Sequence, residues 1–191
     1  MSRRQQGITI IELVISIAIL AIALTSVTLL LSGGLRRSSD TLLEVRAVAL
    51  GQAYLDEILG KRFDENTRDS GIPPCRNSIG SPRLCSSAIG PETGETRSSY
   101  DDVDDYNGLD EGLGAVDTVL RDPLGNARQG FDNFRVRVSV RAVDVGVGGS
   151  EAGLSVANEL DDSQDAKLIE VTVSHRSLAN GIVFSAYKSN F

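Results

Sequence analysis

The stretch GITIIELVISIAILAIALTSVTLLL, residues 7–31, decides how this chain is organised. The run Ile8–Leu31 contains a single charged residue, Glu12, while the rest of the chain has the mixed composition of a soluble domain. At about 1.5 Å of rise per residue, the run would form a helix of roughly 36 Å, long enough to cross a hydrocarbon layer of about 30 Å. Because Arg3 and Arg4 precede it, we expect the N-terminus in the cytoplasm and everything after the helix across the membrane.

Glu12 distinguishes the interpretations of this helix. A carboxylate in a membrane span costs about 2.5–3.5 kcal/mol near the helix centre and is usually retained for a partner, which here has to be a cation. An ordinary secretory signal, cleaved after Ala21-Ile22-Ala23, would hold Glu12 in its apolar core and leave apolar residues through Leu31 beyond the cut. An unprocessed signal anchor fits the length but gives Glu12 no role.

The segment Gly7-Ile8-Thr9-Ile10-Ile11-Glu12-Leu13 resembles the class III signal of type IV prepilins, usually written G-F-T-L-I-E after a short basic leader. The resemblance implies that prepilin peptidase cuts between Gly7 and Ile8 and that the new amine on Ile8 is methylated. It also implies an assembly role for Glu12, whose carboxylate can neutralise such an amine on a neighbouring subunit and set its register. The sequence departs from the family at Ile8, where phenylalanine is most frequent.

The same resemblance implies an α+β architecture, the type IV pilin fold, in which a long two-part N-terminal helix packs on a small antiparallel β-sheet. Residues 1–7 would be the leader peptide, residues 8–31 the transmembrane and filament-core helix, and residues 32–191 the periplasmic head. The head is expected to contain the second half of the helix over 32–60, a loop-rich region over 61–126 and the antiparallel sheet over 127–191.

An amphipathic pattern after Ser32-Gly33-Gly34 predicts the second half of the helix. Each glycine costs about 1 kcal/mol in a helix interior, so the pair indicates either a flexible point or a place where helices pack closely. Charged residues such as Glu57 fall outside the predicted buried stripe. The stripe consists of residues three or four apart: Leu42, Val45, Ala49, Gln52, Leu55 and Leu59.

Three strands are predicted in the last third of the chain, over residues 134–141, 168–175 and 182–187, where apolar and polar residues alternate. Short connections favour an antiparallel meander. Residues 146–164 are expected to form a surface loop with a short helical turn near 152–160. The predicted inward-facing residues are Phe134, Val136, Val138, Val140, Ile169, Val171, Val173, Ile182, Phe184 and Ala186.

Cys75 and Cys85 lie in a Pro/Gly/Ser-rich stretch of a domain that we expect to be exported. A disulfide between them would close a short loop and stabilise the fold by roughly 2.5–3 kcal/mol. Free thiols and a zinc site are the alternatives, although a zinc site needs about four ligands and His175 is the only histidine.

The acidic segment Tyr100–Gly108 is a candidate calcium loop, because carboxylate oxygens in a tight loop suit that ion. Its spacing departs from the EF-hand pattern, and the alternatives are a solvated loop that forms turns or a contact to a neighbouring subunit. This segment and the closing residues Ser185–Phe191 also resemble minor pilins of the mannose-sensitive haemagglutinin (MSHA) type. The candidate metal ligands are Asp101, Asp102, Asp104 and Asp105.

The expected function is therefore structural, since no catalytic constellation is recognisable and no cofactor is expected. A net charge of −7 argues against nucleic acid as a partner. We expect a minor pilin that is anchored in the inner membrane and then assembled into a pilus. Its partners would be prepilin peptidase, other pilin subunits, the inner-membrane assembly machinery and membrane lipid. A tip-located adhesive or ligand-binding pilin and a type II secretion pseudopilin are the alternative functions.

Overall fold

The computed structural model describes residues 9–68, 70–76, 83–86, 88–144, 155–156, 166–178 and 180–190. The chain divides into two units, Met1–Leu42 and Leu43–Phe191. Helix α1, Ile10–Leu59, begins in the first unit and ends in the second. The helix continues through Gly33 and Gly34, so the predicted flexible point does not interrupt it.

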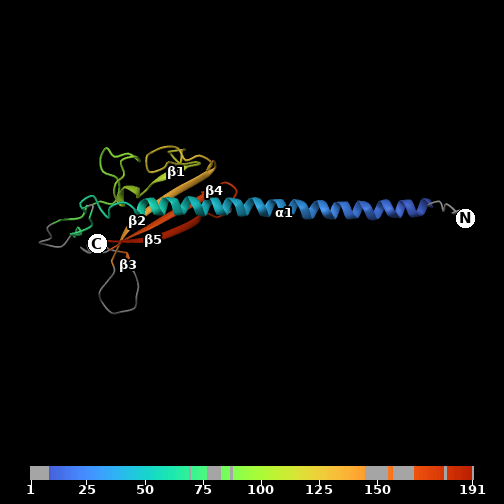
Figure 1. The fold of residues 1–191 in the computed structure, drawn as a ribbon, viewed down its shortest axis with the longest axis horizontal. Helices are drawn as coiled ribbons and strands as arrows, with labels where there is room; N and C mark the ends of the chain where they lie inside the picture. The colour runs from blue at the N-terminus through green and yellow to red at the C-terminus, as the bar shows by residue number, and fades with distance from the viewer. Residues whose placement is uncertain are drawn as a thin grey trace, which may run out of the picture. The chain divides into compact units, whose positions relative to one another are not determined.

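The second unit, Leu43–Phe191, contains an antiparallel sheet with the strand order β1-β2-β4-β5, and β3 pairs with the end of β2 on the side away from β4. The three predicted strands are confirmed, each slightly longer than expected (Figure 1). In chain order the strands are β1 (Asp110–Gly112), β2 (Phe134–Asp144), β3 (Ser155–Val156), β4 (Ala166–His175) and β5 (Ile182–Ser189), and a 3-10 turn η1 (Asp104–Tyr106) precedes β1.

Two short strands were not predicted. β1 lies in the region expected to be loop, and its residues Asp-Glu-Gly carry no strand pattern. Pairing with β2 holds β1 in place. This close pairing requires a glycine at position 112, because a Cβ there would lie 2.2 Å from the Phe134 carbonyl oxygen and the φ of Gly112 is 98°. The predicted helical turn near 152–160 is wrong at Ser155–Val156, which form β3, and its other residues lie outside the described part of the chain.

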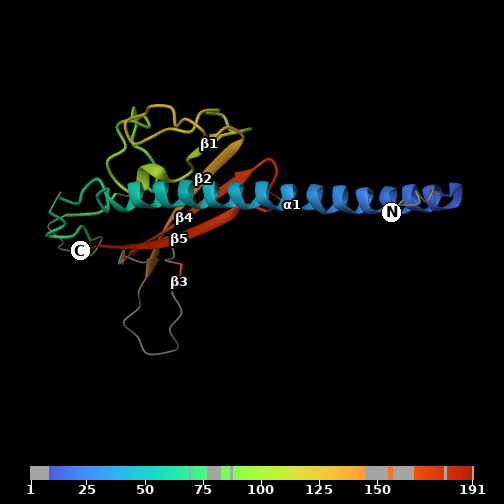
Figure 2. The same cartoon turned by 45° about the vertical axis from the view of Figure 1, so that its right-hand side comes forward.

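The segment of α1 that belongs to the second unit lies across one face of the sheet (Figure 1 and Figure 2). The helix is confirmed, but most of the predicted buried stripe is wrong, since Leu42 is 54% exposed and Val45 is 61% exposed. Of that stripe, Leu55 is partly buried and packs against the core. The prediction missed Gly51 and Tyr54, because glycine and tyrosine were not counted as core residues. The buried face consists instead of Ala47, Leu50, Gly51, Tyr54 and Ile58.

The core lies between this face of α1 and the inward face of the sheet. The predicted inward residues of β2 and β4 are buried, which confirms the strand phase. Ile182 and Phe184 of β5 are partly buried and pack against the same core. The buried core residues are Ala47, Leu50, Tyr54, Ile58, Val103, Tyr106, Leu120, Phe134, Val136, Val138, Val140, Ile169, Val171 and Val173.

A buried polar network joins α1 to the loops above the sheet. The Arg97 guanidinium forms ion pairs with Glu57 of α1 and with Glu111 of β1, where the Nε to Oε1 distance is 3.2 Å. Tyr54 donates its hydroxyl to Glu111 over 2.6 Å, and Tyr106 donates to Glu57 over 2.8 Å. Buried carboxylates are tolerated when they are paired and hydrogen-bonded in this way. Glu57, predicted to lie outside the buried face, is therefore only 3% exposed at its side chain.

Candidate functional site: the N-terminal helix and the acidic segments of the head

The predicted processing site, Gly7 and Ile8, lies outside the described residues, so cleavage and methylation there stay predictions. The described chain starts at Thr9, directly before α1. Thr9 caps the helix, because its Oγ1 accepts the Glu12 N–H over 3.4 Å and its carbonyl accepts the Leu13 N–H over 3.1 Å. Glu12 thus occupies the first turn, where a carboxylate is favoured by the helix dipole.

Glu12 is exposed within the first unit. Among the described residues, it makes no ion pair within the chain. The carboxylate is therefore available to a cation supplied from outside the chain.

The apolar part of α1 presents hydrocarbon on all sides. The segment Ile10–Ser32 is long and apolar enough to cross a membrane by length and composition, and its residues are exposed. Its large side chains are exposed along its whole length, from Ile10 at 83% to Leu30 at 77%. An exposed apolar surface this extensive indicates burial in lipid or against other helices.

The few hydroxyl side chains of this segment are satisfied by the helix itself. Ser16 donates to the Glu12 carbonyl over 2.7 Å, Thr28 to the Leu24 carbonyl over 2.8 Å and Ser32 to the Thr28 carbonyl over 2.8 Å. Thr25 and Ser26 make equivalent bonds one turn back. Because these hydroxyls need no water, they add little to the cost of placing the helix in an apolar medium.

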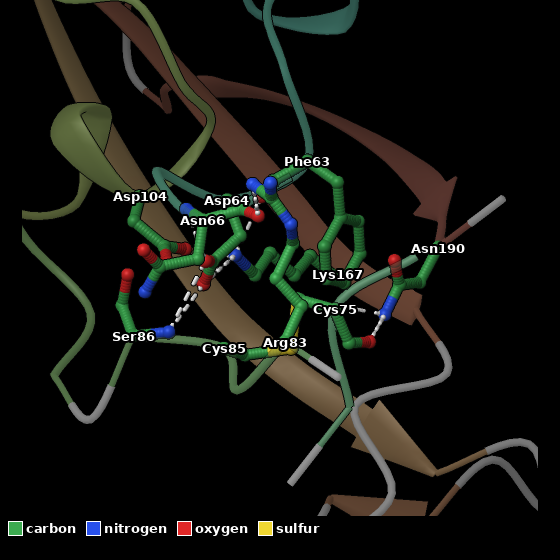
Figure 3. The surroundings of a disulfide bond; sticks show 10 residues. All are labelled: Phe63, Asp64, Asn66, Cys75, Arg83, Cys85, Ser86, Asp104, Lys167 and Asn190. Atoms are coloured by element: carbon green, nitrogen blue, oxygen red, sulfur yellow. Dashed lines mark hydrogen bonds and ion pairs between the residues drawn. A yellow bond between two sulfur atoms is a disulfide. The ribbon is translucent and has the colours of Figure 1, made fainter. Parts of the chain in front are cut away.

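The predicted disulfide is present in the head, where Cys75 and Cys85 are joined with Cα atoms 4.8 Å apart. Both cysteines are buried against Phe63 (Figure 3). Asn190, at the end of the described chain, donates its side-chain amide to the Cys75 carbonyl over 2.7 Å. The disulfide loop is thus held against the segment that follows β5.

A buried lysine lies beside this loop, as Figure 3 shows. Lys167 of β4 is fully buried and donates to the Phe63 carbonyl over 2.6 Å and to Asp104 over 2.7 Å. Asp64 lies 3.6 Å from the same ammonium and accepts the backbone N–H groups of Asn66 and Ser86. Burial raises the pKa of Asp104 to about 6, while Lys167 acts in the opposite direction.

The interpretation of the acidic segment as a solvated loop is wrong for three of its four aspartates, because Asp102, Asp104 and Asp105 are buried. The turn-forming part of that interpretation is right. Asp102 Oδ1 accepts the N–H groups of Asp104 and Asp105, and Asp105 Oδ2 accepts those of Asp101 and Asp102. Burial, followed by the Asp104 and Asp105 charges, raises the pKa of Asp102 to about 7. Asp101 alone is exposed, and it pairs with Arg62 over 2.5 Å.

Sequence reasoning missed Lys167, Arg97 and the glutamates Glu92 and Glu95. Lys167 had a detectable signal, because it precedes Ile169 by two positions and so shares the inward face of β4. Arg97 had no local signal, since its partners lie on α1 and β1. The ring centre of His175, the only histidine, lies 4.5 Å from that of Phe134, and its Nδ1 accepts the Ser177 N–H.

Comparison with known proteins bears on the N-terminal segment. Residues 2–28 match the family model described as the prokaryotic N-terminal methylation motif. No curated protein and no solved structure matches the chain significantly. The motif lies over the capped first turn with Glu12 and over most of the apolar segment of α1. Together with the long helix and small antiparallel sheet, it supports a type IV pilin-like protein, either a pilin or a pseudopilin.

Proposed function

We propose that this chain is a minor pilin, a structural subunit of a type IV pilus of the MSHA type. Prepilin peptidase removes residues 1–7, and the mature chain begins at methylated Ile8. The apolar segment of α1 first holds the subunit in the inner membrane and then packs among the helices of its neighbours. The head, which follows the membrane segment, faces the periplasm and later the filament surface.

The observation that carries this proposal is the single carboxylate in the otherwise uncharged apolar segment of α1, Ile10–Ser32. Glu12 is exposed in the first turn, four positions after the proposed mature N-terminus. The amine freed by cleavage supplies the cation that a carboxylate in an apolar environment requires. A pair between Glu12 of one subunit and the amine of its neighbour would set the axial register, while apolar contacts supply the affinity.

A substitution at Glu12 tests the assembly role. Glu12→Gln keeps the shape of the side chain and removes its charge, so membrane insertion should be unchanged. Incorporation into sheared and purified filaments should fall at least about tenfold, the effect of losing about 1.4 kcal/mol from each contact. The matched control is Glu44→Gln, a change at an exposed carboxylate of the same helix, which should assemble normally. Normal incorporation of Glu12→Gln would contradict the proposed mechanism.

Mass spectrometry of the mature protein tests the processing step. In cells with active prepilin peptidase, we expect a chain that starts at Ile8 and carries a methyl group on its amine. A native chain that still starts at Met1 would describe a tethered periplasmic domain instead. Recovery of the processed chain with a type II secretion machine, and never in pili, would identify a pseudopilin.

A further inference from the structure

Three carboxylates of the head, those of Glu92, Glu95 and Asp105, lie close together. Only Asp105 belongs to the acidic segment Tyr100–Gly108. Glu92 and Glu95 belong to the loop before Tyr100, and Asp105 belongs to η1. One oxygen from each carboxylate can be chosen so that all three lie within 4.8 Å of one another. The loop is closed on itself, because the Glu92 N–H donates to Glu95 Oε2 over 3.1 Å and the Glu95 N–H donates to the Glu92 carbonyl over 3.1 Å.

Two of these carboxylates hold buried oxygens without any hydrogen-bond partner. Asp105 is 1% exposed, and its Oδ2 is fully used by the N–H groups of Asp101 and Asp102. Its other oxygen, Oδ1, is buried without a partner, as is Oε2 of Glu92. The Asp105 carboxylate lies close to both glutamates. Burying such an oxygen removes its hydration without a compensating hydrogen bond, unless a ligand binds to it.

None of the three carboxylates is paired with a cationic side chain of the described residues. Within the described part of the chain, no lysine or arginine lies within ion-pair distance of Glu92, Glu95 or Asp105. The two nearby buried cations are engaged elsewhere, Lys167 with Asp104 and Arg97 with Glu57 and Glu111.

The closeness of the three carboxylates has an electrostatic consequence. Carboxylates this close repel one another when ionised, so either protons or a bound cation must hold them together.

We propose that Glu92, Glu95 and Asp105 bind a calcium ion. An all-oxygen set of carboxylates suits a hard cation better than zinc, whose structural sites are built mainly from cysteine and histidine. Calcium tolerates irregular geometry with mixed one-oxygen and two-oxygen carboxylate binding, and water completes its shell, whereas magnesium demands near-octahedral geometry. Bound calcium would fasten the loop over 92–100 to η1, whose Tyr106 lies in the core.

This site differs from the calcium loop expected from the sequence. Of the four aspartates considered there, Asp101 pairs with Arg62, Asp104 pairs with Lys167, and Asp102 Oδ1 serves the turn of η1. Only Asp105 contributes to the proposed site, and the other two ligands come from upstream of the acidic segment.

Calcium titration of the full-length chain in detergent micelles tests the proposal at pH 8. After treatment with EDTA and its removal, calcium should raise the melting temperature of the head in a saturable way. At a calcium concentration about 100 times the Kd, we expect a rise of roughly 5–10 °C by mass action. Magnesium at the same concentration should give a clearly smaller rise.

Variants locate the ion. Glu92→Gln combined with Glu95→Gln should abolish the calcium-dependent rise, and this variant should fold without calcium because it removes repulsion between like charges. The control is Glu65→Gln, which changes a glutamate of the separate acidic group with Asp101 and Asp102. A rise lost in Glu65→Gln but kept in the double variant would overturn the assignment. So would a wild-type melting temperature that is insensitive to millimolar calcium.

Terbium gives a second readout that does not depend on folding stability. Tyr100 lies close enough to Asp105 and Glu95 for their charges to raise its pKa, so its ring is placed to sensitise bound terbium. Tyrosine-excited terbium emission should appear on binding, compete with calcium and fall at least twofold in Tyr100→Phe while the calcium-dependent thermal shift stays. Emission that is unchanged in the Glu92→Gln and Glu95→Gln double variant would contradict the site. Because these measurements use the isolated chain, their failure would leave the proposed role in filament assembly intact.

Discussion

Lys167 shows how a single residue can hold a region together. It is the only buried lysine among the described residues, and its ammonium lies between Asp104, Asp64 and the Phe63 carbonyl. The lysine ammonium also lies 4.2 Å from the centre of the Phe63 ring. One cation thereby links β4, η1 and the segment that leads to the disulfide loop.

Replacing Lys167 by methionine should destabilise the head by about 3–5 kcal/mol, because the two buried carboxylates would lose their cation while the side-chain volume is nearly kept. Urea unfolding of the full-length chain in micelles, followed by near-UV circular dichroism, measures the change. The control is Arg141→Gln, which breaks the exposed pair with Glu170 and should cost no more than about 1 kcal/mol. Adding Asp104→Asn to the methionine variant should restore part of the stability. A cost equal to that of the control would show that Lys167 is not paired as described.

Among the elements, the contact between α1 and β5 depends on a glycine. A Cβ built on Gly51 would lie 2.3 Å from the Phe184 ring, so the helix can approach this strand only where it has no side chain. This requirement fixes which face of the helix is buried. It also explains why the apolar stripe predicted from larger residues had the wrong phase.

Gly51→Ala should lower the stability of the head by up to about 2 kcal/mol, since overpacking costs about 1–3 kcal/mol and the gain in helix propensity offsets only about 1 kcal/mol. Thermal unfolding measures the effect, and the exposed neighbouring change Gln52→Ala should be close to neutral. Combining Gly51→Ala with Phe184→Leu should recover stability relative to the sum of the single changes. A higher melting temperature for Gly51→Ala alone would mean that the ring moves away without cost.

The pairing of β1 with β2 is reinforced by a two-pronged ion pair. Arg135 donates from Nε to Asp110 Oδ1 over 2.7 Å and from Nη2 to Oδ2 over 2.5 Å. These hydrogen bonds, with the charges of Arg135 and Arg137, lower the pKa of Asp110. A lowered pKa in the folded state means that the pair stabilises the fold above the unfolded-state pKa of about 3.9 and is lost as the pH falls through the folded-state value.

Asp110→Asn should therefore cost up to about 1 kcal/mol at pH 6, a modest value because both side chains are about one-third exposed. The difference from the wild type should begin to shrink as the pH falls below about 4, and it should approach zero below the lowered folded-state pKa, where the wild-type carboxyl also loses its charge. Urea midpoints measured at several pH values give this difference directly. A difference that is constant with pH would rule out the ion pair as its origin.

At the scale of the whole molecule, the chain combines an apolar helical segment with a head that contains several buried charges. The apolar segment has side chains that only lipid or other helices can cover, whereas the head encloses its own core. The disulfide and the buried pairs around Lys167 and Arg97 secure loops that contain little regular structure. This division suits a subunit that is held by its helix and exposes its head.

The long helix, the strands β2, β4 and β5 and the pairing of the two cysteines followed from the order of residues along the chain. The helix and the strands depend on hydropathy and periodicity within a window of about ten to twenty residues, and such patterns are local. The disulfide was expected because two cysteines lie close together in a domain predicted to be exported. Glu12 was informative for the same reason, because a carboxylate in an apolar run can be recognised as unusual before the fold is known.

Burial of charge was decided by the tertiary structure. Lys167 is separated from Asp104 by 63 positions, and Arg97 from Glu57 by 40, so no local pattern could bring either pair together. The phase of α1 likewise depended on where Phe184 meets Gly51 across more than 130 residues. Local sequence sets which segments become helix or strand, but the free energy of a buried ion pair or a close contact exists only after those segments have packed.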